Sequence, residues 1–146
     1  MYDRALETPW WALRLAYGLV PIVAGLDKFS NLLTDWKQYL SPLALRVLPV
    51  PAGTFMELVG VIEIVAGIIV LTKLTRIGAY IVCAWLIGIA LNLISTGHYY
   101  DIAVRDLTLC VGAFALAKLT ELRDRAIVPE THAARSPSFE PSGRHI

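Results

Sequence analysis

The chain has 146 residues, of which 56% are hydrophobic and 17% charged, and its formal net charge is +1. A soluble domain is usually about 45–50% apolar and about 25% charged, so this composition disfavours a soluble domain and favours a membrane protein. The near-neutral charge and the lack of a basic patch interleaved with aromatic residues give no indication of nucleic acid as a partner. The sequence also has no Cys or His spacing typical of a metal site.

Four apolar stretches are each near the ~20 residues that a helix needs to cross a bilayer. We expect spans at about 9–29, 53–71, 77–95 and 99–119. This predicts an all-α integral membrane four-helix bundle as a single domain over residues 1–120. Trp10 and Trp11 suit an interfacial aromatic belt, and no small-residue cleavage site follows them, so the first stretch is expected to be retained.

The segments outside the spans are interrupted by proline. Residues 30–52 contain three prolines and are expected to form an interfacial connection with one short amphipathic helix around Trp36–Tyr39. Residues 121–146 are expected to be helical for one or two turns and then a flexible cytoplasmic tail. Because four spans put both termini on the side with more Lys and Arg, the positive-inside rule predicts cytoplasmic termini.

Each predicted span carries ionisable or amide groups toward the same end, which this orientation makes the outer end. A charge near the membrane centre costs at least ~2.5–3.5 kcal/mol, so these groups are expected to face the bundle interior and to pair. Glu63 lies about 9 Å deeper than Glu57 at about 1.5 Å per residue. The candidate residues, in chain order, are Lys28, Glu57, Glu63, Asn92, Asp101, Arg105 and Asp106.

Helical spacing predicts the faces on which these groups lie. Asp101 and Arg105 are four residues apart, which predicts an ion pair on the fourth span. Asp106 points about 100° away from Arg105, and Lys28 is at the right depth to be its partner. Stripes of small and polar residues are expected at Arg14, Gly18, Pro21, Gly25 and Lys28; at Gly60, Glu63 and Gly67; at Trp85, Gly88, Asn92 and Ser95; and at Asp101, Arg105, Thr108 and Gly112.

Three of these features have a second interpretation. The polar groups can serve only to fasten the helices together, because interhelical polar contacts stabilise membrane bundles. Tyr100 and Trp36 fit an interfacial aromatic belt, or alternatively the walls of a slot for a flat ring. Cys83 and Cys110 lie at similar depth, but Cys83 faces away from the polar stripe, so small buried hydrophobes are favoured over a redox pair.

Three segments resemble the DoxX-like family of small four-helix bacterial membrane proteins over roughly residues 10–120. They are "RLAYGLVPIVAGLDKF", "ELVGVIEIVAGIIV" and "YYDIAVRDLTLCVGAFALAKL", the last with the D-x-x-x-R-D pattern of Asp101, Arg105 and Asp106. The resemblance implies a four-helix bundle in the bacterial inner membrane and a link to quinone-coupled redox chemistry. One branch of the family includes a subunit of thiosulfate:quinone oxidoreductase, and members often act beside a separate catalytic partner.

Together, the resemblance and the outer polar groups predict a subunit of a quinone-linked redox system, a possible oxidoreductase. Glu63 and Asp106 would act as catalytic residues by exchanging protons, because quinone reduction delivers negative charge and takes up protons in a low-dielectric pocket. Lys28 and Arg105 would hold a quinol oxyanion or an anionic substrate. The remaining substrate-binding candidates are Trp36 and Tyr100 beside the ring, with Glu57, Asn92 and Asp101.

The expected partners are the lipid bilayer and either a redox protein or further copies of the chain, because no haem pair, flavin motif or metal cluster is visible in the sequence. The alternative is a non-catalytic assembly or anchoring subunit of a membrane complex, in which the ion pairs are structural. A small-solute transporter is disfavoured, because the two halves of the sequence show no inverted repeat.

Overall fold

The computed structural model describes residues 4–47 and 49–133, and these residues are helical, with no strand. The short 3₁₀ helix η1 (Arg4–Leu6) leads into α1 (Glu7–Ser30). The connection that follows contains η2 (Trp36–Tyr39) and α2 (Pro42–Val47). The remaining helices are α3 (Ala52–Leu71), α4 (Thr75–Ser95) and α5 (Tyr100–Ala133). The predicted stretches at 9–29, 53–71 and 77–95 therefore agree with α1, α3 and α4 to within two residues.

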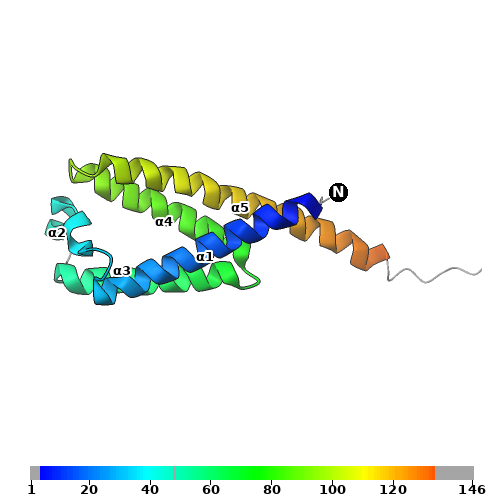
Figure 1. The fold of residues 1–146 in the computed structure, drawn as a ribbon, viewed down its shortest axis with the longest axis horizontal. Coiled ribbons are helices and arrows are strands. Elements are labelled where there is room, and N and C mark those ends of the chain that lie inside the picture. Colours follow the sequence, from blue (N-terminus) through cyan, green and yellow to red (C-terminus); the bar gives the residue numbers. More distant parts are fainter. Residues whose placement is uncertain (1–3, 48, 134–146) are drawn as a thin grey trace, which may run out of the picture.

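The four long helices form two antiparallel pairs, α1 with α3 and α4 with α5 (Figure 1). The pairs meet at the end that holds the start of α1, the α3–α4 turn and the later part of α5; we call this the terminal end. They diverge toward the opposite end, where η2 and α2 lie between them (Figure 1); we call this the connection end. The arrangement puts the start of α1 and the end of α5 at the same end of the molecule, as four antiparallel helices require.

Three helices are long and apolar enough to cross a membrane, namely the η1–α1 segment Arg4–Ser30, α3 and α4. Their side chains leave many large apolar residues exposed, including Val20 at 64% and Leu91 at 62%. Exposed apolar surface of this extent is typical of helices that face lipid. The fourth predicted stretch, 99–119, begins one residue before α5 and otherwise lies within it. Among the described residues, α5 is not one of the helices long and apolar enough to cross a membrane.

Helix α5 is longer than the sequence predicts. It continues without a break to Ala133 and extends past the other helices at the terminal end (Figure 1). We expected one or two helical turns after residue 121, but α5 continues for more than three. The rest of the predicted flexible tail, residues 134–146, lies outside the described part of the chain.

The tightest apolar packing is at the terminal end and in the middle of the molecule. Its buried core contains Trp10, Val70 and Leu116, and Cys83 packs against it as a half-buried side chain. The Trp10 indole donates to Thr120 Oγ1 at 2.8 Å, which ties α1 to α5. Cys83 and Cys110 are free thiols, and Cys110 is buried.

Arg14 accounts for the end of α3. The last carbonyl groups of a helix have no partner within it. The Arg14 guanidinium donates to the carbonyls of Val70, Leu71 and Thr72 at 3.2, 2.6 and 2.8 Å. This charged residue of the first predicted stripe thus caps a neighbouring helix.

Candidate functional site

Helices α1 and α3 approach closely because glycines face each other along their contact. A Cβ atom placed at Gly25 would lie 2.5 Å from the Gly60 carbonyl oxygen, and one placed at Gly60 would lie 2.6 Å from the Gly25 oxygen. Gly18 and Gly67 form a second such contact nearer the terminal end. Small residues let helix backbones come together in this way in membranes. The predicted stripes of the first two spans therefore face each other.

This close approach brings Lys28 of α1 against Glu63 of α3. The Lys28 Nζ atom lies 2.6 Å from Glu63 Oε2, and the side chains are only 4% and 8% exposed. The predicted pairing of Lys28 with Asp106 is wrong, because the glycine contacts direct Lys28 toward α3. A charge buried this deeply requires a partner, and each of these residues satisfies the other.

Two indole rings complete the surroundings of the pair. The Trp36 ring of η2 lies 3.8 Å from Lys28 Nζ, a cation–π contact. Trp85 of α4 donates from Nε1 to the other carboxylate oxygen of Glu63, Oε1, at a long 3.4 Å. Side chains from α1, η2, α3 and α4 therefore converge on one ion pair.

Asp27 holds Trp36 in this position. It accepts a hydrogen bond from Trp36 Nε1 at 2.7 Å and others from the backbone N–H groups of Leu32 and Leu33. The left-handed residue Asn31 (φ 50°) ends α1 just before these residues, and its N–H donates to the Asp27 carbonyl. The carboxylate thus fixes the turn that leads the chain back over Lys28.

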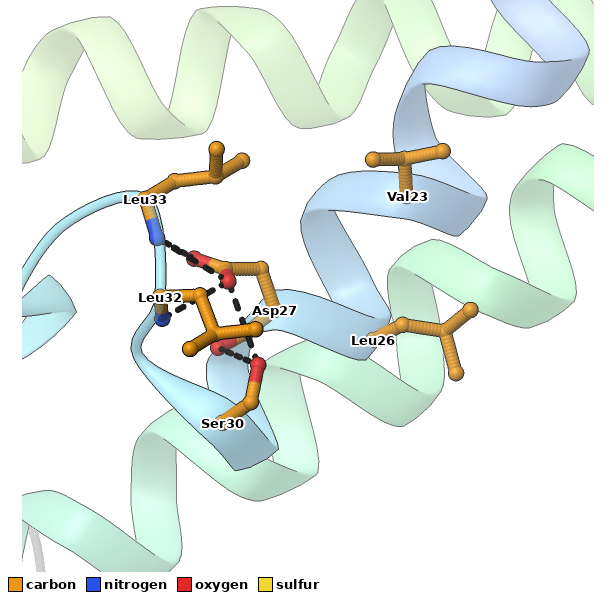
Figure 2. Close-up of a pocket in the computed structure, with 6 residues that line it drawn as sticks. All are labelled: Val23, Leu26, Asp27, Ser30, Leu32 and Leu33. Carbon is orange, nitrogen blue, oxygen red and sulfur yellow. Dashed lines mark hydrogen bonds between the residues drawn. The ribbon is translucent and has the colours of Figure 1, made fainter.

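A hollow of about 290 Å³ opens beside this turn (Figure 2). The Asp27 carboxylate is occupied by Ser30 and the backbone of the turn, as the dashed lines in Figure 2 show, so it offers no free acceptor for a polar ligand. The other lining side chains are mainly leucine and valine. The hollow is lined by Val23, Leu26, Asp27, Ser30, Leu32 and Leu33.

Asn92 anchors the connection to α4. Its Nδ2 donates to the Tyr39 carbonyl at 2.7 Å, and its Oδ1 accepts from the Ser41 N–H at 3.1 Å. The Tyr39 ring meets Tyr99 with ring centroids 4.9 Å apart. Tyr99, rather than the predicted Tyr100, therefore supplies the aromatic contact from this turn, and Tyr100 is exposed.

Arg105 pairs with Asp106 and not with Asp101. The Arg105 Nε and Nη2 atoms lie 3.3 and 3.2 Å from Asp106 Oδ1. Asp106 lies on the buried side of α5, as do Ala103 and Cys110, so its charge needs the partner. Asp101 is exposed in the first turn of α5, where the helix dipole stabilises a carboxylate without an ion pair.

The fourth predicted stripe is consequently wrong for its first three residues, whereas Gly112 does pack closely, because an added Cβ there would clash with the Tyr17 hydroxyl. Asp101, Arg105 and Thr108 are exposed, whereas the buried face of α5 runs one residue further along, through Asp106. On α4, Gly88 has no atom within 4 Å of an added Cβ, so it is not a packing contact. Glu57 is exposed near the start of α3.

Five of the seven polar candidates fall into three groups, whereas Glu57 and Asp101 are exposed and belong to none of them. Lys28 and Glu63 form the buried pair, Arg105 and Asp106 a second pair on α5, and Asn92 the anchor of the connection. No ion pair joins the first two groups within the described residues. Sequence reasoning did not assign Asp27 or Trp85 to the site, although Trp85 lies on the predicted stripe of the third span and Asp27 directly precedes Lys28.

Comparison with known proteins supports the resemblance noted from the sequence. No curated protein sequence and no solved structure matches the chain. The family model for DoxX matches residues 10–95, which include the Lys28–Glu63 pair, Trp36, Trp85 and Asn92 but end before α5. Since this match covers more than half of the 146 residues, the chain belongs to the DoxX family.

Proposed function

We propose that this DoxX-family chain spans the bacterial inner membrane four times, with α5 as the fourth span. Helix α5 packs along α4. Its other side exposes apolar residues, among them Val104, Val111 and Phe114. Arg105, Asp106 and Lys118 interrupt its apolar sequence, but Asp106 is buried and paired with Arg105, and Lys118 lies toward the terminal end. Such a helix can enter a bilayer because its charges are paired or near an interface.

The proposed orientation has the terminal end in the cytoplasm. This end carries Arg4, Lys73, Arg76, Lys118, Arg123 and Arg125. Lys37 and Arg46 lie on the connection at the other end. The excess of cations at the terminal end supports cytoplasmic placement by the positive-inside rule.

Within this placement, the chain acts as a quinone-linked redox subunit that binds a quinone near the Lys28–Glu63 pair. The observation that carries the proposal is this ion pair, which is buried between α1 and α3 and contacted by two indole rings. Intramembrane ionisable groups are functional candidates because they are costly to keep there. A quinone that accepts two electrons takes up two protons to become a quinol. An ammonium can stabilise the negative charge that develops, and a carboxylate can accept protons from solvent and pass them on.

The candidate roles follow from the charges of the side chains. Lys28 and Arg105 stabilise negative charge on the quinone oxygens, while Glu63 and Asp106 exchange protons. The Arg105 side chain is 64% exposed and uses only part of its hydrogen-bonding capacity on Asp106, so it has donors left for a ligand. Trp36 provides a flat apolar surface beside Lys28. Electrons come from a partner redox protein.

A second function is favoured by the same contact. Lys28 and Glu63 are fully engaged with each other, and glycine contacts surround them, as expected if the pair only fastens α1 to α3. The chain would then be an assembly or anchoring subunit of a membrane complex. Polar contacts between helices serve this purpose in membrane bundles.

Replacement of the whole ion pair distinguishes the two functions. The Lys28→Met, Glu63→Met double variant removes both charges and leaves no unpaired charge behind. We expect protein purified in mild detergent to retain bound quinone in the wild type, and the double variant to lose most of it while keeping its melting temperature. Quinone extracted per protein and a thermal melt measure the two quantities.

The control is the Trp10→Phe, Thr120→Val double variant, which removes a buried polar contact between α1 and α5 at the terminal end. It should retain its quinone. If the Lys28, Glu63 double variant binds as much quinone as the wild type, the proposed site is wrong. If the wild type carries no more quinone than an unrelated membrane protein purified in the same way, the assembly function is favoured.

A further inference from the structure

A cluster of basic and aromatic side chains lies on α4 and α5 at the terminal end, away from the Lys28–Glu63 pair. At its centre, the Glu121 carboxylate is 3.2 Å from Lys118 Nζ and also accepts from Arg125 Nη2. The Arg76 guanidinium, in the first turn of α4, acts on the same carboxylate. The pKa of Glu121 is lowered by the Lys118 hydrogen bond and charge and, to a smaller extent, by Arg125 and Arg76.

One carboxylate cannot neutralise these three cations. Lys118 and Arg125 are 52% and 74% exposed, whereas Glu121 is only 19% exposed, so the positive groups form the outer surface of the cluster. A lysine ammonium has three N–H donors and a guanidinium five, and Glu121 accepts only a few of them. Asp124, the next acidic residue of α5, makes no ion pair with any residue that the structure describes.

Aromatic rings continue the cluster along the lipid-facing side of the same two helices. Lys118 Nζ lies 5.8 Å from the centroid of the Phe114 ring, and Phe114 meets Tyr80 with centroids 6.3 Å apart. The Tyr80 hydroxyl interacts with the Lys118 ammonium. Phe114 and Tyr80 are 47% and 38% exposed. An exposed apolar surface therefore leads directly to a group of unneutralised cations.

Two other arginines of the terminal end are already engaged. Arg14 donates to three carbonyl groups of the α3–α4 region. Arg123 pairs with Glu7 at 3.0 Å and stacks over the Trp10 ring at 4.1 Å. Arg4 of η1 and Lys73 of the α3–α4 turn are the other cations of this end, and they lie outside the group that Arg76, Lys118 and Arg125 form on α4 and α5.

We propose that Arg76, Lys118 and Arg125, with Tyr80 and Phe114, bind the phosphate headgroup of an anionic phospholipid at the cytoplasmic interface. The phosphodiester receives hydrogen bonds from the cations, and an acyl chain lies along the two rings. The rings favour a lipid over free phosphate, because free phosphate has no apolar part to place there. The proposal rests on the membrane placement of α4 and α5 and is independent of quinone binding.

The test measures binding of phosphatidylglycerol and phosphatidylcholine to the full-length protein in detergent, by native mass spectrometry over a titration. We expect the wild type to bind phosphatidylglycerol more tightly. Each Lys or Arg near an anionic lipid surface contributes about 1 kcal/mol, or roughly 5-fold in affinity. The Lys118→Gln, Arg125→Gln variant should therefore lose about 25-fold in affinity for phosphatidylglycerol, and Arg76→Gln alone about 5-fold.

The matched control is Lys37→Gln, Arg46→Gln, which removes two cations from the connection end. It should bind phosphatidylglycerol as the wild type does. An equal loss in this control would show unspecific attraction and overturn the proposal. Equal binding of the two lipids, or full competition by millimolar inorganic phosphate, would also overturn it. Arg76→Gln leaves both Glu121 ion pairs intact, so its result is decisive even if the double variant does not fold.

Discussion

The two helix pairs both pack closely, but they use different small residues to do so. Helices α4 and α5 pack through alanines such as Ala90, Ala103 and Ala113. Helices α1 and α3 pack through glycines and add the buried Lys28–Glu63 pair. Both use small residues, as expected where lipid removes the hydrophobic drive for helix association. Among the described residues, a buried ion pair crosses the α1–α3 contact but not the α4–α5 contact.

The difference follows from how each pair is connected. Helices α4 and α5 are joined by the short turn at residues 96–99, which sets their register covalently. Helices α1 and α3 are separated by the long connection at residues 31–51, which leaves them free to slide by a turn. A slip along the glycine contact would leave Lys28 and Glu63 buried and unpaired. We infer that the buried Lys28–Glu63 pair fixes the register of α1 against α3, whereas the short turn fixes the register of α4 against α5.

The largest expected effect comes from breaking this ion pair on one side only. Lys28→Met or Glu63→Met should each lower the free energy of unfolding by about 3–5 kcal/mol, because an unpaired charge remains buried. The double variant should lie within about 1.5 kcal/mol of the wild type, because apolar residues can replace a buried pair at little cost. Unfolding in a titration with sodium dodecyl sulfate measures all three. Additive losses in the double variant would contradict the coupling.

A smaller effect is expected from a methyl group in the α1–α3 contact. Gly25→Ala would place its Cβ against the Gly60 carbonyl, so the helices must separate. Overpacking of this kind costs about 1–3 kcal/mol. The same titration measures the loss.

Gly88→Ala is the matched control, because Gly88 of α4 is also in a helix but has open space around it. It should be neutral or stabilising by up to about 1 kcal/mol through helix propensity. Equal destabilisation by the two substitutions would show that close backbone approach is not what Gly25 provides.

The next effect concerns the connection that joins the two pairs at the connection end. Asn92→Ala removes both hydrogen bonds from Asn92 to residues 39 and 41, which we expect to cost about 1–3 kcal/mol. The loss should be local, with faster hydrogen exchange of the Ser41 amide and little change in α1 or α3. Ser95→Ala, one turn further along α4, should leave this exchange unchanged.

The positions of α1, α3 and α4, and the sides on which α1 and α3 meet, could be predicted because both depend on patterns within a single stretch of sequence. Apolar length defines α1, α3 and α4, and glycine spacing identifies the sides of α1 and α3 that meet. The short helix α2 was missed because Pro42 was interpreted as an interruption, whereas proline is well tolerated as the first residue of a helix. The length of α5 was underestimated because the prolines and polar residues after position 120 were interpreted as the end of regular structure, whereas α5 continues through Pro129 to Ala133.

The charge partners could not be predicted in the same way. Lys28 has two acids at similar depth, and the choice between Glu63 and Asp106 depends on which helices form a pair, a tertiary feature with no local signal. The i,i+4 rule favours Asp101 for Arg105, but it compares only positions on one helix. Asp106 is buried whereas Asp101 is exposed, and the flexible Arg105 side chain reaches the buried acid that follows it in sequence.

The smallest expected effect tests this last pairing. The Arg105 side chain is largely exposed, so its ion pair with Asp106 should contribute less than about 1 kcal/mol. A double-mutant cycle of Arg105→Gln with Asp106→Asn should give a small but measurable coupling energy in the unfolding titration. The cycle of Arg105→Gln with Asp101→Asn should give none, because Asp101 is exposed and forms no ion pair with any described residue. The reverse result would restore the partner that helical spacing favours, and it would mean that the charge on Asp106 is stabilised by a different group.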